Sequence, residues 1–327
     1  MSPPLIQTSE LTRRYGAVTA LDALSVVIEP GITGLVGANG AGKSTLAKIL
    51  LGLVSPSSGS ASVMGHDVVQ GRAQIRALVG YMPEHDCLPP DMSATEFVAF
   101  LARCSGLPAT AARERAAEVL RHVGLFEERY RPMGGYSTGM AQRVKLAQAL
   151  VHDPRILILD EPTNGLDPAG RDEMLALVAR TGHEFGISVL VSSHLLGELE
   201  RICERIVLIE QGRLRRVASV GSLTEATGTL VVELDRDAAT LQHFAELLSA
   251  RGLTARLERH NVLVEVPAGD VSAGDVPAHD GTVPTGHHVP AEYAVYDAVR
   301  DVALSMDAGI LRLERRRGQL AELFHGQ

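Results

Sequence analysis

The sequence predicts an α/β protein whose larger domain contains a partly parallel sheet, followed by a smaller α+β domain. Residues 5–218 alternate short β-branched runs with longer helical patterns, which is typical of layered α/β folds. Beyond residue 228 this alternation ends and a different order of strands and helices begins. The length of 327 residues is enough for two domains with separate cores.

In the first domain, 1–218, three short aliphatic runs read as buried strands: 32–36, 156–159 and 188–191. The segment 43–51 has a helical pattern directly after the first of them. The pattern from Ala94 to His152 is mostly helical, so we expect a helical subdomain at about 84–152, inserted between two strands of the sheet.

A glycine-marked linker is expected at 219–228, before a C-terminal domain at 229–327. Its elements follow the order β, α, β, β, α, β, which resembles a ferredoxin-like unit. The segment 267–290 is rich in Gly, Pro, Asp and His and has no apolar periodicity, so we interpret it as a mobile loop. The predicted elements are 229–234, 238–250, 255–258, 262–266, 293–306 and 310–313.

Composition and charge exclude several classes of protein. The net charge is −8 and aromatic residues make up 4%, which disfavours a protein that coats duplex or stacks on single-stranded nucleic acid. We expect neither a signal peptide nor a membrane-spanning segment. The three cysteines show no paired metal-ligand spacing, which favours reduced thiols in the cytosol.

Residues 37–45 read GANGAGKST and fit the pattern G-x-x-x-x-G-K-[ST] between a strand and a helix. Glycines allow backbone N–H groups to surround phosphates, and the following helix N-terminus favours anions. Lys43 would reach the β and γ phosphates, and the Ser44 hydroxyl would ligate Mg²⁺. The residues expected to bind the nucleotide here are Gly37, Asn39, Gly40, Gly42, Lys43, Ser44 and Thr45.

Two carboxylates follow the aliphatic strand 156–159. Asp160 lies at the carboxyl end of this strand, where open α/β sheets bind ligands, and we expect it to hold Mg²⁺. Glu161 is placed to accept a proton from the attacking water, a role worth about 10²–10⁴-fold in rate. The alternative is that this acidic pair only caps a helix.

Three further segments accompany these two: 136–143 (YSTGMAQR), 165–168 (GLDP) and 192–194 (SSH). With the phosphate loop and the acidic strand, they make at least five motifs in order over about residues 5–218. The sequence thereby resembles the ATP-binding subunit of ABC transporters, which implies a P-loop NTPase fold of the ABC type, ATP and Mg²⁺ as cofactors, and ATP hydrolysis coupled to transport.

The resemblance implies further residue roles. Tyr15 is similar to the aromatic residue that stacks on adenine, although it could instead be a core residue at a strand end. Ser137 and Gly139 resemble the signature that clamps the γ-phosphate bound to the opposite subunit. Asp167 resembles a residue of the family's interface loop, which links the two ATP sites. His194 resembles the switch histidine that contacts the γ-phosphate.

Two departures from the family pattern stand out. The usual signature Leu-Ser-Gly-Gly-Gln reads here with Tyr136, Thr138 and Met140 in place of Leu, the first Gly and Gln. The family usually has a glutamine that senses Mg²⁺ and the attacking water, and this chain has Glu84 at that position. A carboxylate there can ligate the metal, but it adds negative charge near the phosphates. Both changes resemble the branch that exports drugs, lipids or ions through separate type-2 permeases.

One chain carries one phosphate loop and one signature, so the resemblance implies a second copy or a paralogue, and a permease as membrane partner. This would place the chain in the cytoplasm, peripheral on the inner face of the cell membrane. The segment 84–104 would receive the permease. Phe97, Phe100 and Leu101 in this segment either face that partner or pack internally.

The competing function is a soluble ABC ATPase that clamps ribosomes or DNA. Lys43 and Asp160 are about 117 residues apart, with neither heptads nor cysteine pairs between them, and the chain is acidic. These observations favour transport, and we expect no nucleic acid partner. We interpret the histidines of the predicted loop (His279, His287 and His288) as solvated in preference to metal-binding, and the run 315–317 as a solvated face or a contact to anionic lipid.

Overall fold

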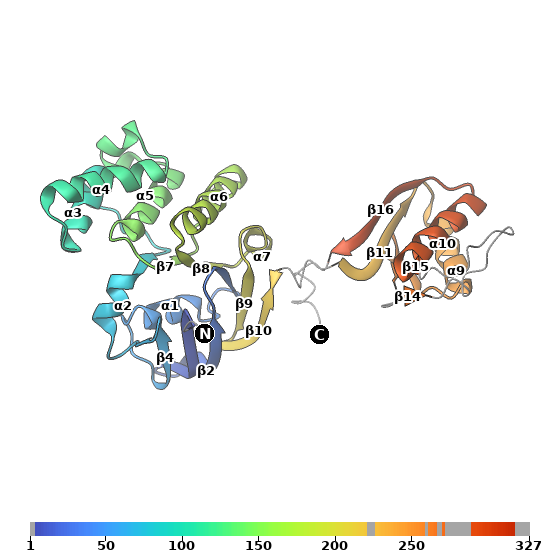
Figure 1. Cartoon of the computed structure of the whole chain (residues 1–327), viewed down its shortest axis with the longest axis horizontal. Coiled ribbons are helices and arrows are strands. Elements are labelled where there is room, and N and C mark those ends of the chain that lie inside the picture. The colour runs from blue at the N-terminus through green and yellow to red at the C-terminus, as the bar shows by residue number, and fades with distance from the viewer. Residues whose placement is uncertain (1–3, 221–225, 259–260, 267–269, 272–288, 318–327) are drawn as a thin grey trace. The chain divides into compact units, whose positions relative to one another are not determined.

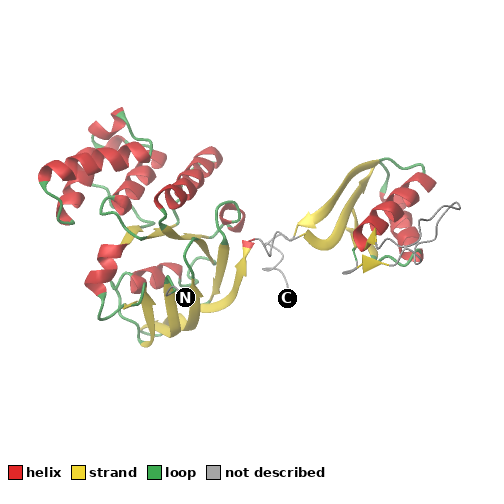
Figure 2. Ribbon diagram, in the orientation of Figure 1, coloured by secondary structure: helices red, strands yellow, loops and turns green. Residues whose placement is uncertain are grey.

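The structure is a computed structural model that describes residues 4–220, 226–258, 261–266, 270–271 and 289–317 (Figures 1 and 2). The chain divides into two compact units, Met1–Val220 and Gly221–Gln327. No helix in the described part of the chain has the length and apolar character needed to cross a membrane.

A six-stranded mixed sheet forms the centre of the first unit, in the order β10-β9-β3-β8-β7-β6. Its strands pair in parallel except for β10, which runs antiparallel to β9. Every residue of β3, β7 and β8 is buried, as expected for parallel strands covered on both faces. The strands are β3 (Ile32–Val36), β6 (Val79–Met82), β7 (Ile156–Asp160), β8 (Ser188–Ser193), β9 (Arg205–Glu210) and β10 (Arg213–Ser219).

A second, antiparallel sheet has the order β2-β1-β4-β5. Helix α1 (Lys43–Leu50) shares one core with both sheets, in which Leu46 and Ile49 of the helix are fully buried beside Ile158 of β7. This packing holds the start of α1 against the end of β3. The strands are β1 (Ile6–Tyr15), β2 (Val18–Ile28), β4 (Ser58–Val63) and β5 (His66–Asp67).

The segment predicted to be helical contains three helices that Figure 1 shows grouped at one end of this unit. A capping box begins the first, because Ser93 and Glu96 each bond to the other's backbone N–H. The helix that follows the predicted signature begins at Thr138, with Ser137 as its N-cap. The other α-helices of the unit are α2 (Arg72–Leu78), α3 (Ala94–Cys104), α4 (Ala109–His122), α5 (Thr138–Leu150), α6 (Pro168–Phe185) and α7 (Leu196–Leu199).

The second unit contains an antiparallel sheet in the order β12-β13-β11-β16, with two helices against one face (Figure 2). Phe244 is fully buried between helices and sheet. A short ladder, β14 (Asp270–Val271) with β15 (Val289–Pro290), occurs inside the predicted loop, whose histidines lie outside the described residues. The other elements are β11 (Ala226–Leu234), α9 (Ala238–Ala250), β12 (Ala255–Glu258), β13 (Asn261–Glu265), α10 (Ala291–Ser305) and β16 (Ile310–Arg317).

Candidate functional site

The phosphate loop connects β3 to α1 and has no room for side chains at its start. A Cβ at Gly37 would lie 2.4 Å from the backbone oxygen of Ile209, a clash that only glycine avoids. Gly42, the N-cap of α1, has a φ of 107°, a left-handed conformation that favours glycine. The loop therefore brings bare backbone and a helix N-terminus together, which is the arrangement that binds phosphate.

Lys43 is almost fully buried and is held at two points. Its Nζ donates a hydrogen bond to the Gly37 carbonyl at 2.7 Å and lies 3.2 Å from Glu161 Oε1. Lys43 and Glu161 are each 6% exposed. The ammonium that the sequence analysis assigns to the phosphates therefore lies beside the loop backbone, ion-paired to the predicted base.

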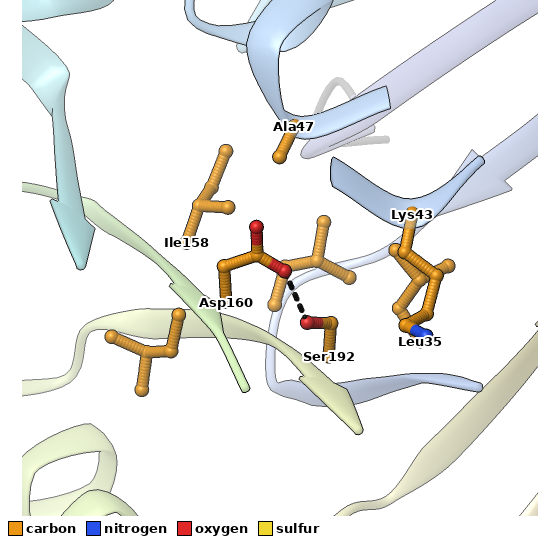
Figure 3. Close-up of a pocket in the computed structure, with 8 residues that line it drawn as sticks. Leu35, Lys43, Ala47, Ile158, Asp160 and Ser192 are labelled. Atoms are coloured by element: carbon orange, nitrogen blue, oxygen red, sulfur yellow. Dashed lines mark hydrogen bonds between the residues drawn. The ribbon is translucent and has the colours of Figure 1, made fainter. Parts of the chain in front are cut away.

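Asp160 at the end of β7 is 3% exposed and accepts a hydrogen bond from the Ser192 hydroxyl at 2.7 Å (Figure 3). The same Ser192 oxygen accepts a bond from the Glu161 backbone N–H at 3.0 Å. A cavity of about 10 Å³ beside these residues and Lys43 has space for about one water molecule. Ser192 therefore holds the carboxylate of Asp160 and the backbone of Glu161, a role that the sequence analysis missed.

Glu161 has a φ of 50°, a left-handed conformation that costs a non-glycine residue about 1–3 kcal/mol. Its contacts compensate for this strain. Besides the bond from its N–H to Ser192, its Oε2 lies 2.8 Å from His194 Nδ1. His194 follows β8 and is 44% exposed. Lys43, Glu161 and His194 thus form one chain of contacts from the phosphate loop to the surface.

Glu84 lies just beyond β6 and is held by two residues of other elements. Its Oε1 accepts a bond from Asn164 Nδ2 at 3.3 Å, and its backbone oxygen accepts one from Lys145 Nζ at 2.8 Å. Burial and the charge of Asp160, followed by that of Glu84, raise the pKa of Tyr81 in β6 itself. Acidic charge therefore gathers at the ends of β6 and β7.

Four predicted residues lie apart from this cluster. Tyr15 is 44% exposed, and the Arg13 guanidinium lies over its ring, 4.5 Å from the ring centre. Ser137 accepts the N-cap bond of α5, and Asp167 the N-cap bond of α6. Within the part of the chain that the structure describes, no hydrogen bond or ion pair joins these three, or Gly139, to Lys43 or Glu161.

The residues at the carboxyl ends of β3, β7 and β8 suit a nucleoside triphosphate with Mg²⁺. The glycine-lined loop is a cradle that a Cβ would fill, and Lys43 supplies a fixed positive charge beside it. Mg²⁺ prefers oxygen ligands, and the hydroxyl of Ser44 and the carboxylate of Asp160 supply them from α1 and β7. The donor set therefore fits both groups.

The three residues of α3 that could contact a permease differ in burial. Phe97 is 8% exposed and belongs to the core, so the internal reading holds for it. Phe100 is 54% exposed and lines a surface groove with Cys104 and Leu107. Leu101 is half-buried.

The fold and the site define a P-loop ATPase with a mixed sheet. A family model described as "ABC transporter" matches residues 21–164. The chain is 38% identical over 240 residues to a Nod factor export ATP-binding protein I of Burkholderia pseudomallei, covering 72% of this chain and 77% of that one. It is 37% identical over 211 residues to the bacitracin transport ATP-binding protein BcrA of Bacillus licheniformis, covering 64% and 68%.

Among solved structures, the chain is similar to the dimeric structure of MJ0796, a bacterial ABC transporter cassette. The TM-score is 0.60 at 25% identity, over 66% of this chain and 98% of that one. The chain therefore belongs to the ABC transporter ATP-binding proteins. It is the subunit that binds and hydrolyses ATP to energise a permease, as the sequence predicts.

Proposed function

We propose that two copies of this chain, or this chain and a paralogue, enclose two ATP molecules and drive an export permease by closing and reopening. The observation that carries the proposal is the chain of contacts beside the phosphate loop, in which the buried pair Lys43–Glu161 connects to the partly exposed His194. These contacts bring an ammonium, a carboxylate and an imidazole together beside the loop, and this supports their assignment as phosphate-binding cation, base and switch residue.

Each residue has a distinct part in this cycle. The loop and Lys43 bind the phosphates of ATP, including its γ-phosphate, and Tyr15 stacks on the adenine. Glu161, once released from Lys43, accepts the proton of the attacking water. His194 contacts the γ-phosphate and holds Glu161 through the same ring. The other loop residues bind phosphate through backbone N–H groups, which include those at the N-terminus of α1. These residues are Gly37, Asn39, Gly40, Gly42 and Thr45.

The second subunit completes the site. Ser137 and Gly139 stand at the N-terminus of α5, which favours anions, and they are exposed or half-buried with no contact to their own Lys43 among the described residues. This exposure supports a role across an interface. Asp167, at the start of α6, would lie at that interface and link the two sites.

Mg²⁺ would be held by Ser44, Asp160 and Glu84. When bound, it neutralises phosphate charge in the transition state. Ser192 keeps Asp160 in place for this task, because its hydroxyl bonds the carboxylate at 2.7 Å. Glu84 can serve as a ligand because its Oε1 has a single donor, Asn164, among the hydrogen bonds of the described residues.

The permease would contact the segment 84–104 on the inner face of the cell membrane. Phe100 is exposed in this segment and lies on the same helix as the core residue Phe97. Export is supported by the relative whose name describes Nod factor export. The cargo is set by the permease.

The C-terminal unit is proposed to be a ferredoxin-like accessory domain, 229–327, after a linker at 219–228. Apart from the short β14–β15 ladder, its elements follow the order β-α-β-β-α-β, and this order and the strand order β12-β13-β11-β16 support the assignment. The ATPase domain would then end near residue 218.

A dimerisation experiment tests the ATP sandwich. Glu161→Gln should bind ATP without hydrolysing it. Size-exclusion chromatography with light scattering should then give twice the monomer mass for this variant in the presence of ATP. Ser137→Glu in the same background should remain monomeric, because the added charge repels phosphate across the interface. The matched control is Ser105→Glu, at the exposed C-cap of α3. A monomer in ATP, with Ser137 intact, contradicts the proposal.

A capture experiment tests the partner. The Glu161→Gln chain, trapped in ATP and purified from detergent-solubilised cells, should retain an integral membrane protein. Recovery of ribosomes or DNA in its place would support the soluble clamp and overturn the transport assignment.

A further inference from the structure

Helix α5 carries a buried charge that the proposed chemistry does not use. More than half of its residues are buried, so the helix is surrounded by protein on most sides. Lys145, in its middle, is 3% exposed. Burying an ammonium is costly unless it is paired and hydrogen-bonded, so a lysine at this position requires specific partners.

The partner of Lys145 is the segment 83–87, here termed the Glu84 loop. Lys145 Nζ donates to the Glu84 backbone oxygen at 2.8 Å. Burial lowers the pKa of Lys145, and nearby negative charge opposes that shift. The carboxylates that supply this charge are Asp86 and Glu84 of the loop and Asp160 of β7. The ammonium therefore stands among acidic groups of the loop and of β7.

A second connection joins the same helix to Glu84. Gln142, one turn before Lys145, donates from Nε2 to the Asn164 backbone oxygen at 3.1 Å. Asn164 in turn donates from Nδ2 to Glu84 Oε1 at 3.3 Å. Helix α5 therefore contacts the Glu84 backbone directly, through Lys145, and the Glu84 side chain indirectly, through Gln142 and Asn164.

We propose that Lys145 is a positioning residue that fixes the Glu84 loop and offsets the negative charge of Glu84, so that a carboxylate can act there beside the phosphates. The proposal rests on the assignment of Glu84 to the Mg²⁺ and γ-phosphate site. Because Ser137 begins the same helix, α5 connects the signature to the Glu84 loop.

A double-mutant cycle tests the charge role. The four proteins are wild type, Lys145→Met, Glu84→Gln and the double variant. Lys145→Met should lower kcat about tenfold or more when Glu84 is present, with a smaller change in KM for ATP. In the Glu84→Gln background the same substitution should cost at least about fivefold less, because the charge to be offset is gone. Lys145→Arg should recover most of kcat.

Hydrogen exchange on the nucleotide-free protein provides a readout besides activity. Lys145→Met should raise amide exchange in the Glu84 loop several-fold, whereas Lys48→Met, at an exposed lysine of α1, should leave it unchanged. Methionine retains the length of the side chain, and melting temperatures identify any variant that fails to fold.

The outcomes separate the possibilities. Equal losses of kcat in both backgrounds, or unchanged exchange in the Glu84 loop, overturn the positioning role. If the wild-type chain hydrolyses no ATP while the exchange result holds, the proposed function of the site fails and the structural part of this inference stands.

Discussion

The ion pair between Lys43 and Glu161 makes a quantitative prediction about the nucleotide-free protein. The perturbation is Glu161→Gln, which removes the negative charge but retains the shape of the side chain. In the nucleotide-free state Glu161 is the anion next to Lys43, at 3.2 Å, and both side chains are 6% exposed. The substitution therefore leaves a buried ammonium whose ion pair is gone and whose remaining acceptors among the described residues are the carbonyls of Gly37, at 2.7 Å, and Ala38, at 3.5 Å.

The magnitude follows from this distance. Two unit charges 3.2 Å apart attract by about 5 kcal/mol at an effective dielectric constant of about 20. Removing one partner of a buried pair costs about 3–5 kcal/mol. The new amide oxygen still accepts a hydrogen bond worth about 1 kcal/mol. We therefore expect the free energy of unfolding of the nucleotide-free ATPase unit to fall by about 2–4 kcal/mol.

Nucleotide binding should change in the opposite direction. ATP supplies Lys43 with a new counter-charge, so the variant regains on binding what it lost when free. About 2 kcal/mol corresponds to a roughly thirtyfold lower Kd for ATP. Hydrolysis should fall by about 10²–10⁴-fold, because the proposed base is gone.

Calorimetry with a non-hydrolysable ATP analogue gives the Kd, and thermal unfolding without nucleotide gives the stability. The expected fall in Tm is at least about 4 °C for a unit of this size. Glu173→Gln is the matched control, since Glu173 pairs with Arg143 at 2.8 Å but is 67% exposed. Exposed pairs contribute at most about 1 kcal/mol. If Glu161→Gln alters Tm and Kd no more than this control does, the reasoning about the buried pair is wrong.

Three other predictions concern single positions. Ser192→Ala removes the hydroxyl that bonds Asp160, and because bonds to charged groups contribute about 1.5–3 kcal/mol, steady-state kcat should fall about tenfold to a hundredfold; an unchanged kcat refutes its positioning role. Gly37→Ala should abolish ATP binding in calorimetry and lower Tm by several degrees, because the new Cβ meets a backbone oxygen at 2.4 Å, whereas Gly197→Ala meets nothing within 4 Å and should leave ATP binding intact. Burial raises the pKa of the Cys203 thiol to about 12, so at pH 8 it is protonated and unreactive; a thiol reagent should modify the two exposed cysteines of the native chain and the third only in denaturant.

The sequence was sufficient for the parts of the fold and site that depend on local pattern. A continuous aliphatic run predicts β7, and its buried faces agree with that reading. The loop before Lys43 was predicted because its glycines are required by the backbone itself, as the clash at Gly37 demonstrates. Burial on α3 was less predictable. Phe97 and Phe100 share a helix, yet one is in the core and the other is exposed, and which is which depends on the neighbouring helix α4.

The residues that were missed share a physical property. Ser192, Gln142 and Lys145 bond to residues of the site, often at backbone atoms, from elements far away in sequence. A motif is recognised by the side chains that reach a ligand, and a supporting side chain can come from any element that the tertiary fold brings close. Lys145 was nevertheless detectable in principle. It stands in the helical run Val144–Leu150, otherwise almost wholly apolar, and a charge within such a run is buried only where it has a partner. Such residues determine the geometry of the site. Their substitution should therefore change catalysis, although their side chains do not contact ATP in the proposed mechanism.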